Sequence, residues 1–158
     1  MEELDLVGPW EVLRMWQLSW PEDGVDVFTI SLDGGTVTCA KGMQIVTDRP
    51  AADVGPVDVL LYPGGSGTRR YIGDEAVGGW LRDRPATTYW SQLGTLTELD
   101  PTIEVRPDDR FVDSGEVVTA AGVSAGIDMA LHLVARLHSE ERARQVKKAI
   151  QYDPRPPV

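Results

Sequence analysis

The apolar segment Asp58–Tyr62, DVLLY, constrains the fold more than any other part of the sequence, and it ends at Pro63-Gly64-Gly65. Successive side chains of a strand point to opposite faces, so an unbroken apolar run would be buried on both sides. Strands of that kind are typical of parallel sheets that helices cover. The segment therefore predicts a parallel sheet inside an α/β protein.

Strands and helices alternate along the rest of the chain. Strands are expected at Val25–Ser31, Thr36–Ala40 and Val117–Ala121, with a hairpin joining Ile103–Val105 to Arg110–Val112. Helices are expected over Pro9–Trp16, 74–82, Thr88–Leu99, Ser124–Leu137 and Glu140–Ile150. The alternation predicts an α/β sandwich. The length of 158 residues suits one domain, so we expect a single domain over 1–158.

Charge and composition exclude several classes of partner. The formal net charge is −10, and a phosphate backbone repels such a surface, so we expect no nucleic-acid partner. No run approaches the roughly 18 apolar residues of a membrane span. The acidic N-terminus, MEELDLVGPW, lacks the order of a signal peptide, and only one cysteine is present. These features predict a cytoplasmic protein that needs no membrane and no disulfide.

Two glycine motifs invite functional interpretations. Gly64-Gly65-x-Gly67 follows the apolar strand but lacks the remaining residues of a dinucleotide or P-loop fingerprint. It is either a plain strand-to-helix turn or a loop whose N–H groups bind an oxyanion. Gly122-Val123-Ser124-Ala125-Gly126 matches the nucleophile elbow G-x-S-x-G. Both histidines lie on the helix that Ser124 opens, so no separate base is expected, and we interpret Ser124 as a helix cap.

The remaining polar candidates have structural interpretations. Asp128 and His132 are four residues apart on one helix face, and two ligands without a third make a poor metal site. We expect them to form a side-chain pair, and we expect neither a metal nor a cofactor. Cys39 lies inside a short strand with no helix N-terminus after it to lower its pKa. It is interpreted as a small buried apolar residue.

Five motifs in order resemble the ThiJ/PfpI superfamily, also described as class I glutamine amidotransferase-like. They are EELDLVGPWEVL, VDVLLYPGGSGTRR, RPATTYW, RFVDSGEVVTAAGVSAGIDMALHLV and IQYDPRPP. The branch they resemble most contains isonitrile hydratases and the sensor domains of AraC-type regulators. The resemblance implies a three-layer, flavodoxin-like (Rossmann-like) sandwich with a mainly parallel sheet. It also implies that Asp5 is the family's acidic residue and that Gly65, beside Gly64, is the oxyanion-binding amide.

The chain departs from this family pattern in two places. Relatives carry a strand, a cysteine at a V-C-T-G-A-like elbow and a helix between the positions of Arg82 and Ala86, a block of about 30 residues. Here only Asp83-Arg84-Pro85 stands between them. The family's first strand is expected to be absent too, and Tyr89 occupies a position where the family commonly has a histidine. The sequence therefore predicts that Asp5, Gly64 and Gly65 are vestigial, with no catalytic residue.

Three functions remain open. The first is a truncated family member without covalent catalysis, a remnant or a small-molecule binder. The second is a sensor domain related to AraC-type regulators. The third is an isonitrile hydratase-like or amidase-like enzyme. In relatives the two missing strands flank the counterpart of Asp58–Tyr62, so we expect exposed strand edges and a homo-oligomer or otherwise self-associating protein.

Overall fold

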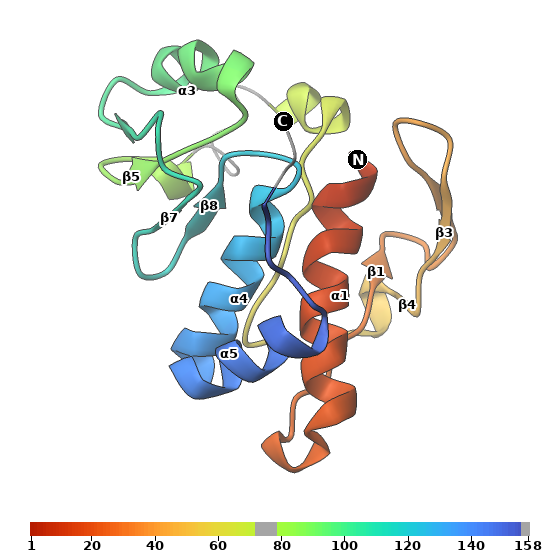
Figure 1. Ribbon diagram of the computed structural model, residues 1–158. Helices are drawn as coiled ribbons and strands as arrows, with labels where there is room; N and C mark the ends of the chain where they lie inside the picture. Colours follow the sequence, from red (N-terminus) through yellow and green to blue (C-terminus); the bar gives the residue numbers. More distant parts are fainter. Residues whose placement is uncertain (72–78, 156–158) are drawn as a thin grey trace.

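Three helices from the two ends of the chain pack together in the computed structural model, which describes residues 1–71 and 79–155 (Figure 1). They are α1 (Glu3–Ser19), α4 (Ala125–Leu137) and α5 (Glu140–Ala149). Their shared core consists of Val12, Trp16, Ala130, Val134 and Val146, all buried. Each large apolar side chain buried in this way stabilises the fold by about 1.5–3 kcal/mol, so this bundle is the main source of stability.

Helix α1 and helix α4 approach closely where both have small residues. A Cβ atom on Gly8 would lie 2.9 Å from Ile127 Cγ1, and one on Gly126 would lie 3.1 Å from Pro9 Cγ. The expected helix over Pro9–Trp16 is confirmed, but α1 begins earlier, at Glu3. Proline inside a helix costs about 3 kcal/mol, and the burial of Pro9 against α4 offsets that cost.

A buried ion pair joins the turn after α1 to helix α5. Asp23, in the short 3₁₀ helix η1 (Pro21–Asp23), accepts hydrogen bonds from Trp16 Nε1 at 2.7 Å and Arg142 Nη2 at 3.0 Å. His138 Nε2 lies 3.2 Å from the same carboxylate, and only 5% of the Asp23 side chain is exposed. Burial raises the pKa of Asp23, but the hydrogen bonds from Trp16 and Arg142 and the Arg142 charge outweigh it and leave that pKa below its ordinary value.

The described strands form four two-stranded sheets. Two are parallel, pairing β1 (Ile30–Ser31) with β4 (Arg49–Pro50), and β5 (Pro85–Ala86) with β6 (Glu104–Val105). Two are antiparallel, pairing β2 (Thr36–Thr38) with β3 (Gln44–Val46), and β7 (Phe111–Asp113) with β8 (Val118–Ala120). The α/β class is confirmed, whereas the expected mainly parallel sheet is divided into short pairs within residues 1–71 and 79–155.

One expected hairpin is wrong. The strands around Ile103–Val105 and Arg110–Val112 do not pair with each other, because β6 pairs with β5 and β7 pairs with β8. The chain reverses instead after Asp113, where the N–H of Gly115 donates to Asp113 Oδ1 at 2.8 Å and Gly115 has a φ of +93°. A glycine at positive φ beside an acceptor aspartate makes a tighter turn than Pro107-Asp108-Asp109.

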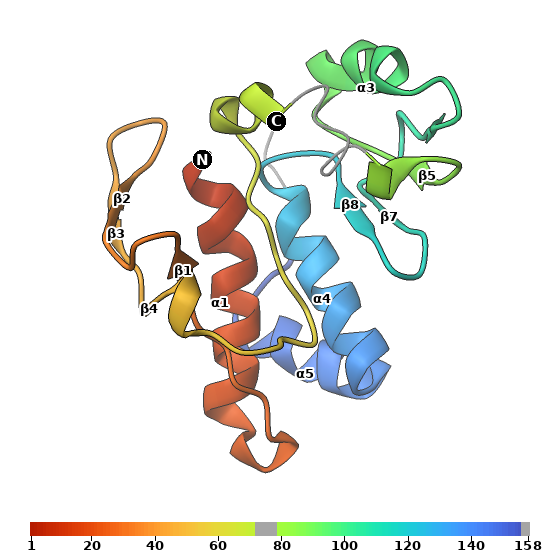
Figure 2. The same ribbon diagram turned by 180° about the vertical axis from the view of Figure 1, so that it is seen from behind.

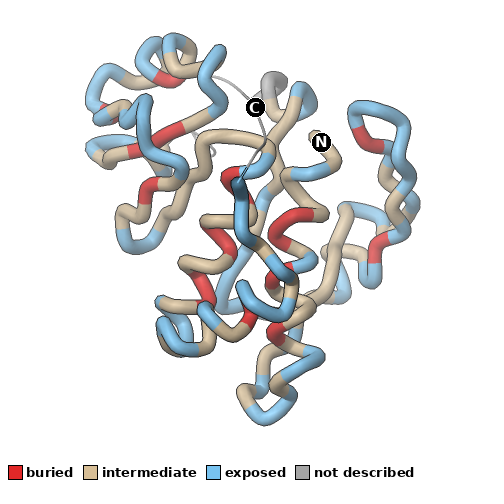
Figure 3. Tube along the Cα trace, viewed as in Figure 1, coloured by how far each residue is buried: buried red, intermediate tan, exposed pale blue. Residues whose placement is uncertain are grey.

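The expected buried strand at Asp58–Tyr62 is also wrong in this structure. The segment is extended but belongs to no sheet, and Val57 and Leu60 are 44% and 58% exposed. It passes across α1 and α4 on the side of the molecule seen in Figure 2. Figure 3 marks most of it as exposed. No described strand lies beside it to bury its second face, which is the physical reason for the exposure.

Short helices and a second, smaller core complete the described chain. The 3₁₀ helices are η2 (Ala51–Asp53), η3 (Ser66–Tyr71), η4 (Gly79–Leu81) and η5 (Trp90–Gln92). The helix expected over Thr88–Leu99 is confirmed in part by η5 and α3 (Leu93–Leu99), which packs on Ala86 and Ile103. Of the expected helix over 74–82, residues 72–78 lie outside the described residues. No helix in the described part is long and apolar enough to cross a bilayer.

Candidate functional site

Asp5 and Gly64 meet at the start of α1. The Asp5 carboxylate accepts a hydrogen bond from the backbone N–H of Gly64, and a Cβ on Gly64 would lie 2.8 Å from Asp5 Oδ2. In return, the N–H of Glu2 donates to the Gly64 carbonyl oxygen at 3.0 Å. These bonds hold the loop after Asp58–Tyr62 against the first turn of α1. The structure brings the expected residues Asp5, Gly64 and Gly65 into one cluster.

Gly65 is required by the geometry of this loop. Its φ is +109°, and a Cβ there would collide with the backbone of Met1 and Glu2. The Gly65 carbonyl oxygen accepts from the N–H of Thr68 at 3.1 Å and from Thr68 Oγ1 at 2.8 Å, which starts η3. The turn is thus fixed from both sides, and it holds the Gly64 amide toward Asp5.

The Asp5 carboxyl is chemically perturbed. Burial raises the pKa of Asp5 above its ordinary value of 3.8, and the N-terminal charge and the Gly64 N–H offset only part of that rise. An acid with a raised pKa can donate or exchange a proton closer to neutral pH than an ordinary aspartate. Asp5, which the family resemblance marks as the acidic residue, thus has the raised pKa that favours proton exchange closer to neutral pH.

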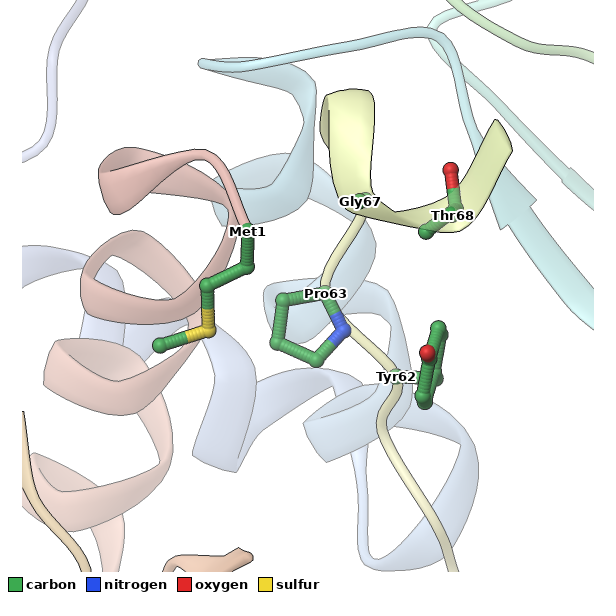
Figure 4. A pocket seen from close by; sticks show the side chains of 6 residues that line it. Met1, Tyr62, Pro63, Gly67 and Thr68 are labelled. Carbon is green, nitrogen blue, oxygen red and sulfur yellow. The ribbon is translucent and has the colours of Figure 1, made fainter. Parts of the chain in front are cut away.

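A small pocket opens beside this cluster (Figure 4). It is lined by Met1, Tyr62, Pro63, Gly64, Gly67 and Thr68 and has a volume of ≈ 90 Å³. A cavity of about 150 Å³ holds benzene, so this pocket suits a molecule of fewer atoms. Sequence reasoning missed Tyr62 and Thr68, although both stand within four residues of Gly64.

Ser124 belongs to a different cluster. It occupies the N-cap position of α4, as expected, but its side chain makes no capping hydrogen bond. Instead Arg110 Nη2 donates to Ser124 Oγ at 3.2 Å, while Arg110 Nε donates to Asp128 Oδ2 at 2.5 Å. The interpretation of Ser124 as a side-chain cap is therefore wrong, because its αR backbone and its arginine neighbour direct the hydroxyl elsewhere.

The turn before Ser124 resembles a nucleophile elbow only in part. In a nucleophile elbow the serine itself sits on the strained turn. Here the strained residue is Val123, one position earlier, whose φ of +25° is unusual for a β-branched residue. Tyr89 packs over this turn, since a Cβ on Gly122 would lie 2.7 Å from its ring.

Tyr152 joins the Ser124 cluster through Asp128. Burial, followed by the hydrogen bond and charge of Asp128, raises the pKa of the Tyr152 hydroxyl. Arginine donates and cannot accept a proton, so Ser124 has no base among its hydrogen-bond partners in the described residues.

The expected pair of Asp128 with His132 is wrong. His132 Nε2 lies 2.7 Å from Asp113 Oδ2, and Arg136 Nη1 donates to both oxygens of Asp113 at 3.0 and 3.1 Å. The hydrogen bond from His132 lowers the pKa of Asp113 despite partial burial, with help from Gly115 and Arg136. His132 thus binds Asp113 of β7 and not Asp128, while Asp128 binds Arg110, which lies just before β7.

Cys39 follows β2 with its side chain buried at 5% exposure, and its N–H donates to the Met43 carbonyl oxygen at 2.8 Å. The interpretation of Cys39 as a small buried apolar residue is confirmed. Among the residues that the structure describes, no three His, Cys, Asp or Glu side chains gather as metal ligands would.

Comparisons with known proteins agree on one family. A sequence model of the DJ-1/PfpI family matches residues 1–84. The isonitrile hydratase of Pseudomonas putida is 30% identical over 184 positions, which cover 99% of this chain and 76% of that enzyme. A solved THiJ/PfpI family protein from Pseudomonas syringae superposes with a TM-score of 0.80 at 25% identity, covering all of this chain and 73% of that one.

A regulator is also similar. The HTH-type transcriptional regulator GbdR of Pseudomonas aeruginosa is 25% identical over 150 positions, covering 79% of this chain. The chain spans only 41% of the regulator's length, so the similarity concerns one part of that protein.

Proposed function

The chain belongs to the DJ-1/PfpI family, and from that membership we propose that it is a non-catalytic member that binds a small molecule beside Asp5. The observation that carries the proposal is the pocket itself, which lies beside Asp5 and whose lining contains no cysteine or serine; the hydroxyl of its one threonine, Thr68, donates to the Gly65 carbonyl oxygen. Covalent catalysis needs a nucleophile within reach of its acid and oxyanion donors. A binding role needs only the pocket.

Two further observations support the loss of the nucleophile. Cys39, the only cysteine of the sequence, is buried at the end of β2 and is not part of the pocket lining. The alignment with isonitrile hydratase runs over 184 positions against the 158 residues of this chain, a difference of 26. That difference has the size expected for the block missing between Arg82 and Ala86.

The chemistry of the pocket limits the ligand. At ≈ 90 Å³ it suits a molecule with about three or four non-hydrogen atoms. Met1, Pro63 and the Tyr62 ring offer apolar surface, while the hydroxyls of Tyr62 and Thr68 are the polar side-chain groups of the lining. We propose a small uncharged ligand with one polar end. Methyl isonitrile and N-methylformamide, which is its hydration product, both fit this description.

Two measurements on the purified chain test the proposal. Methyl isonitrile should not be converted to N-methylformamide above the rate in buffer, and either compound should shift the amide NMR signals of Gly64, Gly65 and Thr68. Ser124→Ala, a variant in the separate polar cluster, should behave as the wild type. Turnover that disappears in Cys39→Ser would refute the non-catalytic role, and unchanged spectra with both compounds would refute the binding role.

A sensor domain is the second candidate, favoured by the similarity to GbdR. A sensor passes ligand binding on to a distant surface. Hydrogen exchange in α5 should then slow when ligand binds, whereas a simple binder should show protection near Gly64 alone.

We also propose that the protein is cytoplasmic and self-associating. The exposed extended segment at Asp58–Tyr62 supports self-association, because unpaired strand edges favour pairing between chains. Sedimentation equilibrium tests this, and cell fractionation tests the location.

A further inference from the structure

The backbone of residues 55–63 has no hydrogen-bond partner in the described part of the chain. None of its N–H or C=O groups bonds to another described residue, although Val54 on one side and Gly64 on the other are both bonded. The segment is nevertheless extended, and its side chains Val57, Val59, Leu60 and Tyr62 are 44–65% exposed. An extended, apolar and unpaired segment has the properties of a strand edge that accepts another strand.

We propose that Val57–Pro63 pairs with the same segment of a second copy, antiparallel about a two-fold axis through Leu60. This inference rests on the self-association proposed above and names the surface that carries it. An antiparallel pair about a two-fold axis uses one patch on both chains, so a single exposed segment suffices. The register places Leu60 opposite Leu60, Val59 opposite Leu61 and Asp58 opposite Tyr62.

This register keeps the two Asp58 carboxylates apart. Asp58 is the only charged residue of the segment 54–68. Each chain also has a net charge of −10, so close like charges across the pair would be unfavourable. Opposite Tyr62, the Asp58 carboxylate faces a phenol hydroxyl that can donate to it. The two Asp58 residues then lie four residues apart along the ladder, about 13 Å at 3.3 Å per residue. That separation exceeds the Debye length of about 8 Å in physiological salt, so their repulsion is screened.

Matched proline variants test the pairing. Successive N–H groups of a strand point to opposite edges, so Val59→Pro and Leu60→Pro block opposite edges of one segment. Neither residue donates a backbone hydrogen bond within the described chain, so both variants should fold as the wild type does by circular dichroism. One of them should raise the dimer dissociation constant about tenfold or more in sedimentation equilibrium, and the other should leave it unchanged.

A pair of cysteine variants tests the register in the otherwise unchanged chain. Leu60→Cys faces its own copy across the axis, where directly opposite Cβ atoms lie within about 5.5 Å, and it should form a disulfide-linked dimer on mild oxidation. Val57→Cys, also exposed, faces Pro63 and should remain uncrosslinked, as should the wild type with its buried Cys39.

Each outcome separates the two proposals. A wild-type chain that stays monomeric at high concentration overturns self-association and this pairing together, while leaving ligand binding at Gly64 untouched. A dimer that both proline variants form equally well, or lose equally, overturns the pairing but keeps self-association. Crosslinking of the Val57→Cys variant without crosslinking of the Leu60→Cys variant overturns the register.

Discussion

Arg110 donates a hydrogen bond to Ser124 at the turn where a serine hydrolase would place its nucleophile. The Nη2–Oγ distance is 3.2 Å, and the same guanidinium binds Asp128 through Nε. A nucleophilic serine needs a neighbour that takes its proton, and a guanidinium does not deprotonate in proteins. Within residues 1–71 and 79–155, the local motif G-x-S-x-G is therefore present without the residues that would make its serine reactive.

The two serines at helix starts should differ in their contribution to stability. Ser139 Oγ accepts from the N–H of Arg142 at 3.1 Å and caps α5, whereas Ser124 makes no such bond to α4. Ser139→Ala should cost about 1 kcal/mol, and Ser124→Ala less than about 0.5 kcal/mol. Urea unfolding of the two variants measures both values, and an equal loss would contradict the assignment.

A fluorophosphonate that labels active serines should leave the protein unlabelled. The reason is that no described residue bonds to Ser124 as a base, since both histidines are engaged elsewhere, His132 by Asp113 and His138 by Asp23. Intact-mass spectrometry gives the readout, with a known serine hydrolase as the positive control. Stoichiometric modification at Ser124 would show that the Arg110 contact is not decisive.

Replacing the perturbed acid should stabilise the protein. Because burial raises the pKa of Asp5, its ionised form at neutral pH costs folding free energy. Asp5→Asn should raise Tm by about 2 °C at pH 7, while Asp53→Asn, an exposed control, should not. The gain should shrink as pH falls through the raised pKa and vanish below about 3.8, where Asp5 is protonated in both states. A pH-independent difference would contradict the electrostatic cause.

The Asp23 ion pair should have the opposite pH dependence. The pKa of Asp23 is lowered, so its stabilising effect is complete above 3.8 and is lost as pH falls through the lowered value. Asp23→Asn should lower Tm by about 5 °C or more at pH 7, and by less and less below pH 3.8. Asp26→Asn is the control, because its ion pair with Arg49 spans 3.5 Å and its side chain is 64% exposed.

The parts of the fold that depend on nearby residues were predictable. Helix α4 begins and ends within one residue of its expected limits, because its apolar pattern and its neighbours in sequence decide it. Asp58–Tyr62 has an equally clear pattern, yet its exposure depends on which strands lie beside it, and no local pattern reports that.

The candidate site divides in the same way. The family motifs pointed to Asp5, Gly64 and Gly65 as vestigial site residues, and the structure places these three residues side by side. The partners of Asp128 and His132 were not predictable, because helix spacing suggested that they pair with each other. Arg110, just before β7, binds Asp128 instead, and Asp113 of β7 binds His132.

The order of the helices in the sequence has a consequence for synthesis on the ribosome. Helix α1 is made first, but Val12 and Trp16 are buried by residues of α4 and by Val146 of α5. About 130 residues separate Val12 from Val146, and at 5–20 residues per second the ribosome needs roughly 7–26 s to make them. During that interval the nascent chain displays an apolar helix with no partner. A chaperone that holds emerging chains would therefore find in α1 an apolar surface that stays uncovered until α5 is made.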